Sequence, residues 1–143
     1  MASKTMEKIY IGQMARLQRT FTEEDVKRCI ALTGDDNAVY RSDAFQWGPY
    51  RPVIPGLLSE GLMTEVITKK LPGTPALLLQ KELVYCHPVY VGDTITAELE
   101  IIDIDLKRSW ITSMVRCLNQ FGREVVKGQV VVLVVADMDE QVV

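Results

Sequence analysis

The feature of this sequence that most constrains its fold is an apolar segment at residues 56–70, GLLSEGLMTEVITKK. Its leucine, methionine, valine and isoleucine positions cover more than one narrow stripe of a helix, and a helix that is apolar on most sides is largely buried. Pro55 suits the start of such a helix, and the sequence LPGTP at 71–75 stops it. The rest of the chain must therefore cover a central helix.

The chain after this helix has the pattern of β-strands. Apolar and polar residues alternate from position 94 onwards, and the alternation changes phase at Ile101–Ile102. Alternation is typical of a strand with one buried face, and a change of phase by one residue is what a β-bulge produces. The last strand is rich in valine, and we expect it to be central. The four predicted strands span residues 76–86, 93–105, 109–118 and 124–136.

The segment before the central helix predicts a strand, a second helix and a long loop. The strand is expected within residues 9–21. The helix begins after Thr22, for which Asp25 is a capping-box partner, and it ends at Gly34. Residues 35–55 are irregular and rich in proline and aromatic residues. A loop of this length inside a compact domain is usually functional.

Together these elements predict a single α+β domain over residues 1–143, with frayed ends at about 1–8 and 137–143. An antiparallel sheet wraps around one long buried helix, which is the hot-dog fold. A chain of 143 residues suits one domain, since a domain commonly holds ~100–200 residues. Long apolar strands leave edges that a lone chain would expose, so we expect a dimer.

Composition and charge exclude several classes of protein. The net charge of -3 gives no basic surface for nucleic acid. No apolar run reaches the ~18 residues that a membrane span needs, and the first residues lack the apolar core of a signal peptide. We therefore expect a cytoplasmic protein that has neither nucleic acid nor a membrane as its partner.

The cysteines and histidines of the chain are few. Cys29, Cys86 and Cys117 are widely spaced and form no CxxC pair, so they are expected to be buried free thiols. His87 is the one histidine of the chain, which excludes a zinc site made of several histidines. Its position in an extended stretch favours a structural or surface role.

Two places in the sequence are candidates for chemistry. The first is the polar cluster Asp35, Asp36 and Asn37, close to Tyr40. Burial can separate the pKa values of two neighbouring carboxylates and give one of them an acid or base role. The same residues are also typical of a solvated turn after a helix, which the residue types alone favour. The second is Gly56, at the start of the central helix.

An amide at a helix start is an unsatisfied donor with a partial positive charge, and glycine lets a ligand oxygen approach it closely. The alternative for Gly56 is a glycine required only for packing. Glu60 and Glu65, on the same predicted helix, could serve as bases. More often such residues form ion pairs at a dimer edge.

Three strings in the chain resemble the MaoC-like (R)-specific enoyl-CoA hydratases. GDDNAVY at 34–40 resembles the family's G-D-x-N-P-x-H segment, and RPVIPGLL at 51–58 resembles its R-P-I-V-H-G-M-L segment. YCHPVYVGDT at 85–94 is similar to its F-x-x-P-V-x-V-G-D-T segment. The resemblance covers roughly residues 9–135.

The resemblance implies a dimeric hot-dog protein that adds water to a trans-2-enoyl thioester of coenzyme A or acyl carrier protein, or removes it. It implies no metal or redox cofactor. By position, the family's aspartate is Asp35, its supporting amide is Asn37 and its oxyanion-stabilising N–H belongs to Gly56. The family's histidine position holds Tyr40, and Pro55 stands where the family has a histidine before the glycine.

These departures predict an altered or weakened hydratase. Tyrosine, with an ordinary pKa of about 10, is a poor base at neutral pH. Asp35 would then be the base, Tyr40 the proton donor or water anchor, and Gly56 the oxyanion donor. One alternative is a non-catalytic acyl-binding hot-dog subunit of a heteromeric dehydratase. The other is a thioesterase that uses Glu60 or Glu65.

Overall fold

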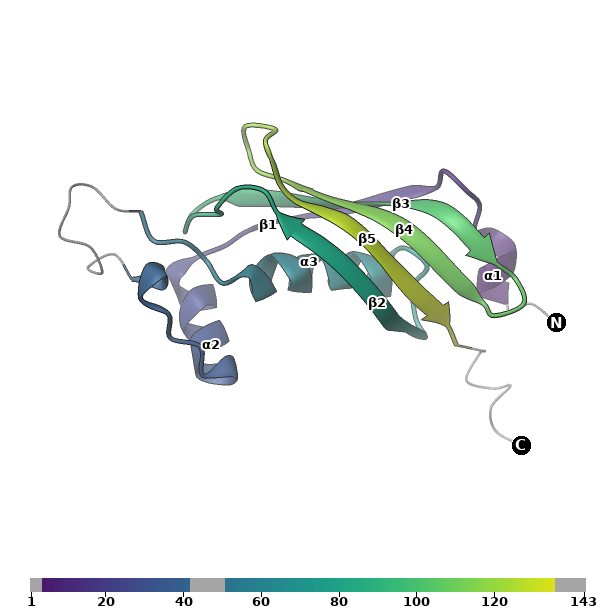
Figure 1. Cartoon of the computed structure of the whole chain (residues 1–143), viewed down its shortest axis with the longest axis horizontal. Coiled ribbons are helices and arrows are strands. Elements are labelled where there is room, and N and C mark those ends of the chain that lie inside the picture. Colours follow the sequence, from purple (N-terminus) through teal and green to yellow (C-terminus); the bar gives the residue numbers. More distant parts are fainter. Residues whose placement is uncertain (1–3, 42–50, 136–143) are drawn as a thin grey trace.

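A computed structural model describes residues 4–41 and 51–135 of the chain (Figure 1). The part of the predicted loop at 42–50 and the predicted frayed end at 137–143 lie outside the described residues. The elements are α1 (Lys4–Lys8), β1 (Met14–Thr20), α2 (Glu23–Thr33), the short helix η1 (Ala38–Tyr40), α3 (Gly56–Lys69), β2 (Ala76–Tyr85), β3 (Thr94–Asp105), β4 (Trp110–Leu118) and β5 (Glu124–Val134).

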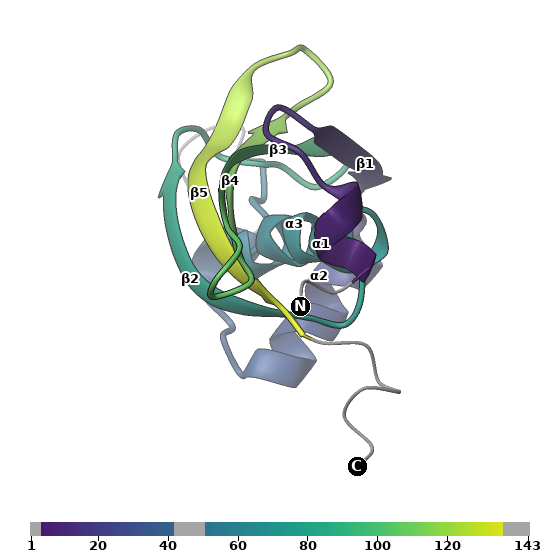
Figure 2. The same cartoon turned by 90° about the vertical axis from the view of Figure 1, so that its right-hand side faces the viewer.

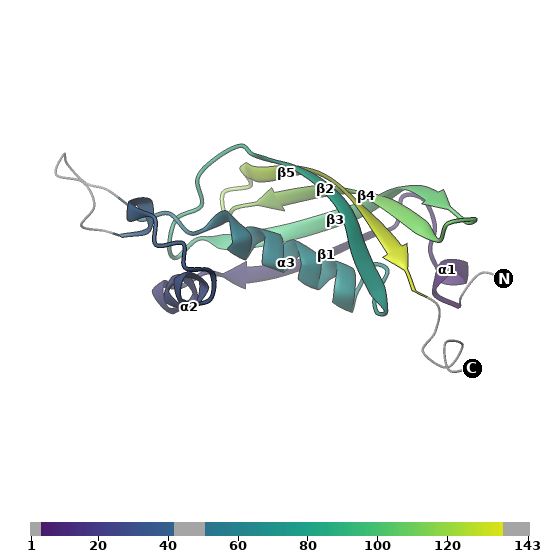
Figure 3. The ribbon, with the colours of Figure 1, turned by 60° about the horizontal axis from the view of Figure 1, so that its bottom comes forward.

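The five strands form one antiparallel sheet in the order β1-β3-β4-β5-β2. The sheet curls around α3 (Figure 2), and α3 runs along its concave face with α2 at one end (Figure 3). The predicted hot-dog fold of the α+β class is therefore confirmed. β5 lies inside the sheet, between β4 and β2, while β4 occupies the middle position.

The link between β2 and β3 is a crossover, because the two strands are not neighbours in the sheet. β2 pairs with β5 at one edge, whereas β3 lies beside β1 near the other edge. Residues 86–93 therefore cross from one side of the sheet to the other. Alternation of apolar residues determines which side chains face the core, but it does not determine which strands are neighbours.

The core lies between α3 and the inner face of the sheet. In β3, Ile95, Leu99 and Ile101 have no exposed surface. The pairing of β3 with β4 shifts between Ile101 and Asp103, so the predicted β-bulge is confirmed. Each fully buried apolar side chain of this kind contributes ~1.5–3 kcal/mol to folding. The α3 side chains that meet this face are Leu62, Met63, Val66 and Ile67.

Both ends of α2 form as the sequence predicts. The Thr22 hydroxyl accepts a hydrogen bond from the Asp25 amide at 3.2 Å, and the Thr22 amide donates to the Asp25 carboxylate at 2.9 Å. Gly34 ends the helix with φ of 77°, a left-handed conformation that favours glycine. These caps fix where the chain leaves α2 and enters the polar cluster.

The N-terminal segment is more ordered than the sequence indicated. Residues 1–8 were expected to be frayed, but Lys4–Lys8 form a helical turn, α1. The Met6 side chain is buried in the core and anchors this turn. One apolar residue among polar neighbours carries too little periodicity to predict a helix.

The three cysteines are free thiols, and two of them are buried, as expected. Burial raises the pKa of the Cys117 thiol to about 12, and burial together with the Asp35 charge raises that of Cys29. The expectation was wrong for Cys86, which is exposed because it directly follows the edge strand β2.

We predict that the denatured, unreduced protein will titrate three thiols, because none is oxidised in a disulfide. In the native protein Cys86 should react first with a thiol reagent, since exposure and thiolate character control reactivity. Cys86→Ser should remove the fast phase and leave two slow thiols. A denatured count of one would contradict the absence of a disulfide.

Candidate active site

The polar cluster after α2 folds back on itself. The Asp35 carboxylate accepts a hydrogen bond from the Asn37 backbone amide at 3.3 Å. The Asn37 side chain in turn accepts from the Val39 amide at 3.2 Å and caps η1. The amide that supports Asp35 is thus the backbone N–H of Asn37, while its side-chain oxygen holds the next turn. Asp35, Asp36 and Asn37 are all exposed.

The structure brings Asp35 and Tyr40 together. The Tyr40 hydroxyl donates a hydrogen bond to Asp35 Oδ2 at 2.9 Å. Burial, this hydrogen bond and the Asp35 charge raise the pKa of Tyr40 to about 12. The phenol therefore keeps its proton at neutral pH, so it can donate a proton or hold a water molecule but cannot act as a base.

Gly56 begins α3, and Pro55 precedes it without any side-chain cap. The amides at this end carry the positive end of the helix dipole. A Cβ on Gly56 would lie 2.8 Å from Cε1 of Tyr85, closer than real Cβ contacts. The glycine therefore has a packing role here, because it lets the Tyr85 ring lie directly against the start of the helix.

Gly56 also lines a cavity of about 670 Å³. Its walls come from the segments at 51–54 and 87–90, of which Pro52 alone does not line it, together with Val39, Ser59 and Tyr85. Backbone hydrogen bonds hold the two wall segments side by side, from Ile54 N to Val89 O at 2.9 Å and from Val91 N to Pro52 O at 3.1 Å. The cavity is thus built where the chain enters α3 and where it crosses between β2 and β3.

Tyr40 and Gly56 do not share this cavity in the described residues. Tyr40 lines a separate hollow of about 390 Å³ against α2, beside Val26 and Ile30. Val39, the residue directly before Tyr40, lines the larger cavity instead. The sequence-predicted residues therefore form two groups, the Asp35–Tyr40 pair and the Gly56 cavity.

Apart from Gly56, none of the residues that line this cavity was predicted as a site residue. Its polar members are Arg51, Ser59, Tyr85, His87 and Tyr90. His87 was expected to be structural or on the surface, and it packs edge-on against Tyr90 with ring centroids 6.2 Å apart. One feature of the sequence could have pointed to these residues: both wall segments lie within the strings that resemble the hydratase family.

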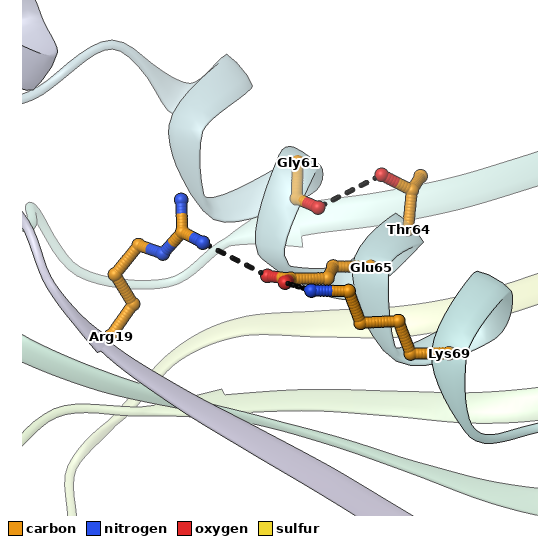
Figure 4. A network of polar contacts seen from close by, with 5 residues as sticks. All are labelled: Arg19, Gly61, Thr64, Glu65 and Lys69. Carbon is orange, nitrogen blue, oxygen red and sulfur yellow. Dashed lines mark hydrogen bonds and ion pairs between the residues drawn. The ribbon is translucent and has the colours of Figure 1, made fainter.

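Neither glutamate of α3 lines the Gly56 cavity, and both form ion pairs. Figure 4 shows Glu65 between Arg19 and Lys69, with the Arg19 contact at 3.2 Å. The hydrogen bond from Lys69 holds the pKa of Glu65 below its ordinary value, which weakens it as a base. Glu60 pairs with Lys81 at 2.6 Å. This geometry gives the thioesterase alternative no free carboxylate in the cavity.

The described ranges contain no cluster of three or more His, Cys, Asp or Glu side chains that could hold a metal ion. In the same part of the chain, no helix is both long and apolar enough to cross a membrane.

A curled antiparallel sheet around one helix, with a cavity at the helix start, defines the chain as a hot-dog protein. The chain matches no family model. It is 31% identical over 134 residues to the (R)-specific enoyl-CoA hydratase of Aeromonas caviae, covering 92% of this chain and 98% of that protein. A mitochondrial 3-hydroxyacyl-[acyl-carrier-protein] dehydratase of Solanum lycopersicum is 29% identical, over 90% of this chain and 79% of that protein.

A solved structure of the (R)-hydratase from A. caviae superimposes with a TM-score of 0.84 at 30% identity, covering 90% of this chain and 99% of that one. The chain therefore belongs to the MaoC-like (R)-specific enoyl-CoA hydratase family.

We predict that Asp35→Asn lowers the pKa of Tyr40, because it removes the carboxylate charge that opposes ionisation of the phenol. Burial, which is the largest cause of the raised value, remains, so the shift should be partial. Ionisation of Tyr40 can be followed by NMR of labelled tyrosine, assigned with Tyr40→Phe. Asp36→Asn, which removes an equal charge from the neighbouring exposed residue, should leave the pKa of Tyr40 in place.

Proposed function

We propose that this chain is an acyl-thioester hydratase and dehydratase that acts on the double bond of a trans-2-enoyl thioester. The observation that carries the proposal is the cavity at the start of α3, lined by Gly56, in a fold that matches an (R)-hydratase over nearly its whole length. Coenzyme A or acyl carrier protein enters as part of the substrate, and the reaction requires no metal or redox cofactor.

The proposed step uses Gly56, Asp35 and Tyr40. Asp35 takes a proton from water as the water oxygen bonds to C3, and the π electrons move onto the thioester oxygen. The Gly56 amide, at the positive end of α3, stabilises this enolate oxygen; one such donor contributes about 10²–10³ in rate. Tyr40 then protonates C2 and recovers a proton from Asp35 through their 2.9 Å hydrogen bond.

One specific observation favours a second candidate, the non-catalytic acyl-binding subunit. Tyr40 and Gly56 line different hollows of the chain, and the family's histidine position holds a tyrosine that cannot act as a base. A subunit that retains the acyl cavity but lacks a complete acid–base pair would have this arrangement. An active homologous partner would then perform the chemistry.

We further propose that the chain forms a homodimer, or pairs with a homologous hot-dog subunit, through β2. β2 lies at a sheet edge, and nearly all of its residues are exposed on both faces. An edge strand with apolar side chains is a template for pairing with another chain. The exposed large apolar residues of β2 are Leu77, Leu78, Leu79, Val84 and Tyr85, and Leu57 of α3 is exposed as well.

Tyr40→His should raise kcat/KM for hydration of crotonyl-CoA, because it restores an acid–base group that titrates near neutrality. Such a group contributes up to ~10²–10⁴ in rate. The gain should be smaller if the loop around position 40 holds the introduced imidazole away from the place of the family's histidine, because a misplacement of ~1 Å costs about a hundredfold in rate. Hydration is followed by loss of the enoyl thioester absorbance.

Asp35→Asn in the Tyr40→His background should abolish the gain, and Tyr10→His, in an exposed turn before β1, should give none. If Tyr40→Phe removes an activity of the natural protein, the tyrosine itself is the acid of the reaction. If no variant hydrates any enoyl thioester while the folded chain still binds acyl-CoA, the hydratase proposal fails and the binding subunit stands.

Light scattering should give a mass of about twice the 16.1 kDa chain, because pairing covers the β2 edge. Leu77→Lys should shift the protein towards the monomer, since it places a charge on this edge. Met114→Lys introduces the same charge at an exposed position on the interior strand β4 and should leave the mass unchanged. A stable monomer of the natural protein in the absence of any partner would refute the homodimer.

A further inference from the structure

A guanidinium lies at the mouth of the Gly56 cavity. Arg51 lines the cavity and stacks over the Tyr90 ring at 4.2 Å from its centroid, while its side chain remains 62% exposed. The carboxylate that it meets in the described part of the chain is Asp93, at 3.8 Å. This contact is longer than a hydrogen bond.

Asp93 is occupied by other donors. Its side chain is almost fully buried, and it accepts hydrogen bonds from the Tyr90 amide and the Gln120 side chain, each at 2.9 Å. Asp93 therefore fixes the position of Tyr90, and it attracts Arg51 by charge without engaging its N–H donors directly. His87 packs edge-on against the same tyrosine ring.

The length of chain between Arg51 and Gly56 is comparable to the length of the pantetheine arm of an acyl carrier. The two residues are five positions apart along a segment that pairs with 89–91, and an extended segment of that length spans roughly 16 Å. When the thioester oxygen lies at the Gly56 amide, the bound pantetheine arm of the acyl carrier has to extend along the cavity towards solvent. An extended pantetheine arm has a comparable length and ends in a phosphate ester.

We propose that Arg51, held over the Tyr90 ring, binds the phosphate that ends the pantetheine arm of the acyl carrier. This inference rests on the proposed function, which places the thioester at Gly56. A guanidinium that stacks on an aromatic ring still presents N–H donors at its edge, and their planar fork matches a phosphate. Coenzyme A and acyl carrier protein share this phosphate, so Arg51 recognises the common part of both carriers.

The test measures steady-state kinetics with three crotonyl thioesters, those of coenzyme A, phosphopantetheine and N-acetylcysteamine. The last carries no phosphate. Arg51→Ala should raise KM about tenfold for the first two, with kcat within about twofold, and should leave KM for the third unchanged. Arg51→Lys should recover part of the loss.

Arg108→Ala is the matched control. Arg108 also stacks on an aromatic ring, 4.9 Å from the Trp110 centroid, and meets a carboxylate at 3.8 Å, but it lies in the β3–β4 hairpin. It should change no KM. An equal effect of Arg51→Ala on all three thioesters would overturn the proposal, because the residue would then be structural. An effect on the coenzyme A thioester alone would also overturn it, since nucleotide phosphates would be responsible.

Binding separates this inference from the proposed function. Calorimetry with free phosphopantetheine and with phosphate-free pantetheine requires no turnover. If the natural protein hydrates nothing, stronger binding of phosphopantetheine that is lost in Arg51→Ala still supports the phosphate site. Equal binding of both compounds to the natural protein would overturn it.

Discussion

The burial of α3 is the constraint on which the rest of the structure depends. The helix is apolar on most sides, and a sheet that curls around it covers what a flat sheet would leave in water (Figure 2). β3 contributes an uninterrupted inner row with no exposed surface, which fixes the register of the sheet against the helix. One end of α3 is thereby held beside the crossing segment 86–93, and the cavity forms at that end.

The two groups of site residues form for different reasons, one within a short stretch of chain and the other between distant segments. Asp35 and Tyr40 are close because the chain leaves α2 through a left-handed glycine and then coils into η1, so their contact arises within a few residues. The Gly56 cavity depends on pairing between 51–54 and 89–91, which are far apart in sequence. Tyrosine at position 40 strengthens the local group, since its hydroxyl satisfies the carboxylate, and it leaves the cavity without an imidazole from that position.

Sequence patterns predicted the elements whose causes are local. The capping box at Thr22, the stop at Gly34, the bulge after Ile101 and the buried helix all follow from residues near one another. The edge position of β2 did not follow, because it depends on a crossover that no alternation records. The place of His87 in the cavity wall was missed for the same reason: Val39 and Gly56, which line the same cavity, come from distant parts of the chain.

Tyr85 belongs to two parts of the molecule at once. It is the last residue of the edge strand β2, and its ring lies against the start of α3 in the wall of the cavity. A chain that pairs along β2 therefore ends its contact at a residue that shapes the Gly56 cavity. If pairing through β2 moves the Tyr85 ring, it changes the free energy of ligand binding in the cavity. This change is a coupling free energy, and such coupling is reciprocal. Assembly would then tune ligand affinity, and ligand would tune assembly by the same factor.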